Sequence, residues 1–75
     1  MEKRFDVSML ISNGEGCGYI EHKTFIGGDV TLEVVKNFIR KNAKDNKELN
    51  IKYTVFEGWG MEQKQVWQIH SWIYN

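Results

Sequence analysis

The alternation of apolar and polar residues near the start of the chain predicts a hairpin of two strands. Apolar side chains occupy every second position of residues 5–12: Phe5, Val7, Met9 and Ile11. This period of two is typical of a strand with one buried face. Residues 13–16 read Asn-Gly-Glu-Gly and predict a turn, because Asn and Gly accept the positive φ of hairpin loops. Residues 18–26 then predict a second, less regular strand, which ends before Gly27 and Gly28.

A helical period follows in residues 31–44. The apolar positions recur at the spacing of an α-helix: Leu32, Val35, Phe38, Ile39 and Ala43. Asp29 or Thr31 can cap the first amides of this helix, and the acidic Glu33 suits its positive N-terminal end. The segment therefore predicts one amphipathic helix with a single buried face.

The last third of the chain predicts two more strands, residues 49–57 and 64–73, joined by a loop at 58–62. One face of the first strand carries Leu49, Ile51, Tyr53 and Val55. In the second strand, Trp67, Ile69 and Ile73 point to one side, and the other side carries Val66, Gln68, His70, Trp72 and Tyr74. A C-terminal helix is the alternative for 64–73, since Val66, Ile69 and Ile73 also match a helical spacing. The β-branched and aromatic residues of the segment favour the strand.

Together these elements predict a single α+β domain, residues 1–75, with the element order ββαββ. We expect a four-stranded, mostly antiparallel sheet with one helix packed on one face. If the C-terminal segment were helical instead, the fold would be of βαβ type with a second helix. With 75 residues the domain can bury only a small core.

Charge and composition narrow the classes of function. Ten basic and ten acidic residues give a net charge of zero, which argues against a protein that attracts polyanions by bulk charge. One cysteine cannot form an internal disulfide, and we recognise neither a signal peptide nor a membrane-spanning segment, so we expect a cytoplasmic protein. The excess of lysine over arginine fits an A+T-rich coding sequence, as in many bacteria and phages.

The clearest candidate for a binding surface is aromatic. Six of the ten aromatic residues, including all three tryptophans, lie in the last 23 positions. The predicted helix covers Tyr53 and Trp67, which become core. The residues left on the opposite face or at the tip of the last loop are predicted to bind a partner: Lys52, Phe56, Trp59, His70, Trp72 and Tyr74.

Three interpretations of these outward-facing aromatic residues stay open. Tryptophan and tyrosine are frequent in protein interfaces, so the face could bind another protein or form a two-fold dimer; the edge of the fourth strand is a second route to a dimer. Aromatic side chains with lysines could instead bind single-stranded nucleic acid or a nucleotide-like anion. In the third interpretation the face is simply amphipathic, or the strand register differs and these side chains are core. The neutral net charge favours a protein partner.

A weaker candidate is the basic edge of the helix, formed by Lys36, Arg40, Lys41 and Lys44. Their spacing places them on the solvent side, where they could contact phosphates or an acidic partner. An ordinary solvated helix face explains the same pattern. This edge is the alternative anion-binding site.

Residues with catalytic or metal-binding chemistry are few. Cys17 lies in a glycine-rich segment that lacks the Gly-Lys-Ser/Thr of a phosphate loop. A nucleophilic thiol or a metal site would need His22 or His70 beside it, and no Cys-x-x-Cys or paired-histidine spacing supports one. We therefore predict no enzyme activity, no metal and no cofactor. The working hypothesis is a small intracellular binding module, an accessory or inhibitor protein of a bacterium or phage that associates with another protein.

Overall fold

The fold has the predicted order of elements. The computed structural model describes residues 2–12 and 18–74, with Tyr74 described by its backbone alone. The helices and strands are β1 (Lys3–Ser12), β2 (Gly18–Gly27), α1 (Leu32–Asp45), β3 (Asn50–Glu57) and β4 (Lys64–His70), with short 3₁₀ helices at Gly60–Glu62 and Ser71–Tyr74. The α+β class and the ββαββ order are thereby confirmed.

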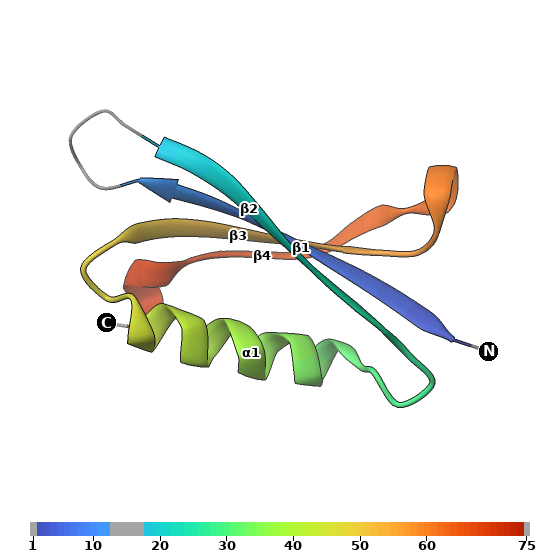
Figure 1. The fold of residues 1–75 in the computed structure, drawn as a ribbon. Helices are drawn as coiled ribbons and strands as arrows, with labels where there is room; N and C mark the ends of the chain where they lie inside the picture. Colours follow the sequence, from blue (N-terminus) through green and yellow to red (C-terminus); the bar gives the residue numbers. More distant parts are fainter. Residues whose placement is uncertain (1, 13–17, 75) are drawn as a thin grey trace.

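The four strands form one antiparallel sheet in the order β2-β1-β3-β4, so β1 and β3 are central and β2 and β4 are the edges. The helix α1 lies along one face of this sheet (Figure 1). Its first turn is capped as the sequence predicts, because the Thr31 hydroxyl accepts the N–H of Val34 at 3.3 Å. None of the described helices is long and apolar enough to cross a membrane.

The core lies between α1 and the two central strands. Its buried members are those that the periodicities predict: Phe5, Val7, Met9 and Ile11 of β1, Ile51, Tyr53 and Val55 of β3, and Val35, Ile39 and Ala43 of α1. Trp67 and Ile69 of β4 are only half-buried and pack at the margin of this core. The phenol of Tyr53 is fully buried and donates a hydrogen bond to the Asn42 side chain at 2.7 Å.

The last strand is shorter than predicted. Residues 64–70 are a strand, so the alternative of a helix there is wrong, but the predicted strand 64–73 ends at His70. The cause is Ser71, whose side chain is 1 % exposed. Its hydroxyl accepts the N–H of Ile51 at 3.0 Å and donates to the carbonyl of Leu49 at 3.3 Å. The hydroxyl thus takes the place of the next backbone pair beside β3, and the chain turns into a 3₁₀ helix.

Val66 also departs from the prediction. The alternation places it on the face away from the helix, yet it is half-buried and packs against the core. The pairing of β3 with β4 shifts between Val55 and Phe56, since Val55 pairs with Trp67 and Phe56 pairs with Gln65. Val66 is the extra residue of this β-bulge, and a bulge changes the direction of the side chain.

We expect the substitution Ser71→Ala to lower the free energy of unfolding by about 1–3 kcal/mol, because it leaves the buried N–H of Ile51 and the partly buried carbonyl of Leu49 without their partner. Urea denaturation measures this loss. Ser8→Ala, at a half-buried position of β1, is the matched control and should change stability by less than about 0.5 kcal/mol. Equal losses in the two variants would contradict the bridging role of Ser71.

Candidate functional site

The candidate site is the face of the sheet that α1 does not cover, called here the open face. Side chains alternate along a strand, so the residues that lie between the buried ones on each strand point to this face. Its members are Arg4, Asp6, Ser8, Leu10 and Ser12 of β1, Ile20, His22, Thr24 and Ile26 of β2, Asn50, Lys52, Thr54 and Phe56 of β3, and Gln65, Gln68 and His70 of β4. In Figure 1 α1 lies entirely on the other side of the sheet.

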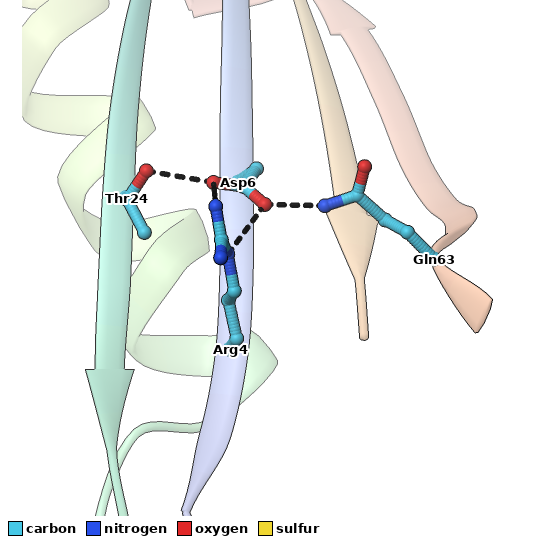
Figure 2. Close-up of polar contacts among 4 residues, drawn as sticks. All are labelled: Arg4, Asp6, Thr24 and Gln63. Atoms are coloured by element: carbon cyan, nitrogen blue, oxygen red, sulfur yellow. Dashed lines mark hydrogen bonds and ion pairs between the residues drawn. The ribbon is translucent and has the colours of Figure 1, made fainter. Parts of the chain in front are cut away.

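A carboxylate network occupies one end of the open face. Asp6 accepts hydrogen bonds from three side chains: Arg4 Nε at 3.0 Å, Thr24 Oγ1 at 2.7 Å, and the side-chain amide of Gln63. Figure 2 shows these groups converging on one carboxylate from β1, from β2 and from the segment that leads into β4. The side chain of Asp6 is 18 % exposed. The network therefore ties three segments of the fold together at one point.

The electrostatics of the network favour an ionised Asp6. Partial burial on its own would raise the pKa of Asp6, but the hydrogen bonds from Thr24 and Arg4, the positive charge of Arg4 and the bond from Gln63 outweigh it and lower the pKa. Arg4 also lies over the ring of Trp59, with its guanidinium carbon 5.2 Å from the ring centroid. The network thus helps to position the loop that carries Trp59.

The loop itself requires glycine at one position. Gly58 has a φ of 121°, and a Cβ there would lie 3.0 Å from the carbonyl oxygen of Glu62. Its N–H donates to the carbonyl of Arg4 at 3.0 Å. Gly58 therefore joins the loop to the backbone of β1, next to the network.

Beside the network lies a polar hollow of about 520 Å³, lined by Arg4, Asp6, Ser8, His22, Thr24, Phe56, Gly60 and Gln63. Phe56 forms its aromatic wall, and hydroxyl, imidazole and amide groups supply hydrogen bonds. The Asp6 carboxylate already accepts four hydrogen bonds, two of them from Arg4, so it has little capacity left for a ligand. The hollow suits neutral polar groups better than a free cation or anion.

The other end of the open face is more apolar. Leu10 is paired across the sheet with Ile20 on one side and with Lys52 on the other, and Lys52 pairs with His70. The imidazole of His70 stacks on the indole of Trp72, with ring centroids 4.1 Å apart and planes inclined by 26°. A second hollow of about 200 Å³ lies here, lined by Leu10, Ser12, Asn50, Ile51, Lys52, His70 and Trp72. We call Ile20, Leu10, Lys52, His70 and Trp72 the apolar row.

The structure distributes the predicted partner-binding residues over both ends. Lys52, His70 and Trp72 belong to the apolar row, whereas Phe56 lines the polar hollow. Trp59 is 46 % exposed beside Arg4, far from Trp72 along the sheet. The side chain of Tyr74 lies outside the described residues. Their proposed role in binding stays a prediction.

Leu10 and Ile20 belong to the candidate site but were not predicted as site residues from the sequence. Both are large apolar residues, 48 % and 57 % exposed, and β1–β2 pairing makes them direct neighbours. One signal was present in the sequence, because Leu10 interrupts the alternation of residues 5–12 with an apolar residue at a polar position. The pairing with Ile20 needed the register of the hairpin.

The basic edge of the helix is partly engaged in contacts within the chain. The ammonium of Lys36 lies 5.0 Å from the ring centroid of Trp67, so this lysine covers a core residue. Arg40 donates to the side chain of Asn37 at 2.8 Å, while Lys41 and Lys44 are exposed. The anion-binding role of this edge stays a prediction.

The two histidines that could support catalysis or metal binding lie apart from each other. Cys17 lies outside the described residues, and His22 and His70 stand on opposite edge strands, separated by β1 and β3. Within residues 2–12 and 18–74, no three His, Cys, Asp or Glu side chains gather into a group that could hold a metal ion.

The substitution Asp6→Asn should lower the free energy of unfolding at neutral pH by about 1–2 kcal/mol, because it weakens hydrogen bonds to a charged acceptor. The folded-state pKa of Asp6 lies below its usual 3.8. The stabilisation is therefore complete above the unfolded-state pKa and is lost as the pH falls through the folded-state pKa. Urea denaturation at a series of pH values should show the two proteins converging at low pH. A gap that stays constant into strong acid, or an equal gap for the exposed control Asp45→Asn, would contradict this.

Comparisons of the chain with protein-family models, with curated protein sequences and with solved structures found no match.

Proposed function

We propose that this chain is a small, non-enzymatic binding module that recognises another protein through the apolar row of its open face. The observation that carries the proposal is the second hollow, set between Leu10 and Trp72 and bordered by large, exposed apolar side chains. From the sequence we further propose that the chain is an intracellular accessory or inhibitor protein of a bacterium or phage.

The apolar row has the features of an interface centre. Leu10, Ile20 and Trp72 are each about half exposed or more, so a partner that covers them gains the free energy of burying apolar area. Tryptophans that border pockets are frequent hot spots of protein interfaces. The hollow between Leu10 and Trp72 can accept an apolar side chain of the partner, which would anchor the complex.

The charges of the open face support a protein rather than a nucleic acid. The guanidinium of Arg4 is paired with Asp6, and Lys52 adds a positive charge in the middle of the apolar row. The single charge of Lys52 suits a partner that presents one carboxylate beside its own apolar side chain. Binding of single strands in salt relies on a cationic groove that follows the backbone. We therefore expect the partner to present an apolar side chain next to an acidic one.

Site-specific photo-crosslinking in the source cell tests this proposal. A photoreactive amino acid at Leu10 should form an adduct with one protein, whereas the same group at exposed Lys41, on α1, should not. With the partner purified, Trp72→Ala should weaken binding by about 30-fold, the effect of losing a hot spot of roughly 2 kcal/mol. Val34→Ala, at a 44 % exposed position on α1, is the control and should leave the affinity unchanged.

Two results would overturn the proposal. One is equal crosslinking from positions 10 and 41. The other is quenching of tryptophan fluorescence by oligo(dT) in moderate salt that Phe56→Ala and Lys52→Ala abolish, which would favour the nucleic-acid alternative.

A further inference from the structure

The backbone edge of strand β2 offers a second interaction surface, and Ile20 is the member of the apolar row that lies on this strand. It runs for ten residues, Gly18–Gly27, and among the strands of residues 2–12 and 18–74 it pairs with β1 alone. Its pairing with β1 is continuous from Lys3–Gly27 to Ser12–Gly18, without a bulge. Side chains from Tyr19 to Thr24 are exposed on both faces of the sheet. A long, regular edge of this kind is a template for pairing with another strand.

The other edge is protected by comparison. β4 has seven residues, contains the bulge at Val66 and passes at once into the 3₁₀ helix that Ser71 holds in place. Bulges and short length are the devices by which proteins block edge-to-edge association. The fourth-strand edge that the sequence analysis named for a dimer is therefore the less suitable of the two.

We propose that β2 pairs with β2 of a second copy in an antiparallel, two-fold manner, joining two sheets into one of eight strands. Side chains that face each other across an antiparallel pair lie on the same side of the sheet. In a two-fold pair of identical strands, one residue therefore faces its own copy, and the two-fold axis lies midway between the two; we name each register by that residue. Three central registers are possible, with the axis at Glu21, His22 or Lys23.

Charge selects one of these registers. An axis at Glu21 places two glutamates opposite each other, and an axis at Lys23 does the same with two lysines. An axis at His22 places Glu21 opposite Lys23 of the second copy, and does so twice. Opposite charges stabilise a cross-strand pair and like charges destabilise it. The strand is thus complementary to itself in the register centred on His22.

The aromatic residues of β2 support the same register. Phe25 packs edge-on against Phe38 of α1, with ring centroids 5.2 Å apart, on the face that the helix partly covers. Tyr19 lies on that face too, 56 % exposed. With the axis at His22, Tyr19 of the second copy stands opposite Phe25. The pairing would therefore extend the core of each copy with an aromatic ring that is half exposed in the single chain.

Charge reversal tests the pairing in the full chain by sedimentation velocity over a wide range of concentration. Wild-type protein should show a concentration-dependent dimer. Glu21→Lys and Lys23→Glu should each weaken the dimer at least about tenfold, since each converts two attractive pairs into repulsive ones. The double variant should restore it, and an equimolar mixture of the single variants should form a heterodimer. Lys41→Glu, with the same change in net charge as Lys23→Glu, should have no effect.

Disulfide trapping tests the register. In a Cys17→Ser background, His22→Cys places two thiols across the axis, at the Cα separation of about 4.5–5.5 Å that directly opposite residues have and that a disulfide accepts. Mild oxidation should crosslink this variant efficiently and the Ile20→Cys variant poorly. A protein that stays monomeric at all concentrations, a dimer that neither charge reversal weakens, or equal crosslinking at both positions would overturn the inference. These outcomes report on the backbone edge of β2, whereas the partner of the apolar row is tested through Leu10 and Trp72, which lie outside β2.

Discussion

The structure is governed by the mismatch in width between one helix and four strands. An α-helix with its side chains is about 10–12 Å across, whereas the outer strands of a four-stranded sheet are about 14 Å apart and each extends further to its own side. The single helix α1 therefore covers the two central strands well and the edges poorly. This is why the fully buried sheet residues belong to β1 and β3, while Trp67 and Ile69 of β4 are half-buried and Tyr19 of β2 is exposed.

The two edge strands, which the helix covers poorly, differ in the other contacts that protect them. At β4, Lys36 reaches from the helix over Trp67, and Ser71 brings the C-terminal turn against β3. At β2, Phe25 packs against Phe38 of the helix, and the side chains from Tyr19 to Thr24 are exposed. The rest of β2 offers its backbone edge and a self-complementary pair of charges. Because the helix is too narrow for the sheet, both edge strands need other cover. Residues of the same chain protect the edge at β4, whereas the edge at β2 is suited to pairing with a second copy.

Sequence periodicity predicted the order of the helix and strands and the buried residues of β1, β3 and α1, but it also placed Trp67 in the core, where the structure leaves it half-buried. The period of two in β1 and β3 and the helical spacing in α1 depend on local alternation, which a sequence displays directly. The end of β4 could not be predicted in this way, because it depends on a hydrogen bond between Ser71 and a backbone group twenty residues away. The bulge at Val66 and the meeting of Leu10 with Ile20 likewise depend on register. Register follows from tertiary pairing, so the apolar row was only partly visible in the sequence.

The Asp6 network has a consequence for how the sheet opens. Its bond to Gln63 links residues 57 positions apart, and its bond to Thr24 links β1 with the edge strand β2. Edge strands and hairpin loops are ordinarily the first parts of a small domain to open locally, each independently of the others. Here β2 and the loop of Trp59 are both bonded to the Asp6 carboxylate. When either segment separates from the sheet, Asp6 loses a hydrogen bond, and Asp6 is also the group that holds the other segment. The two peripheral segments are thereby drawn into the cooperative unit of the central strands, and a force applied at Trp59 would be resisted in part by β2.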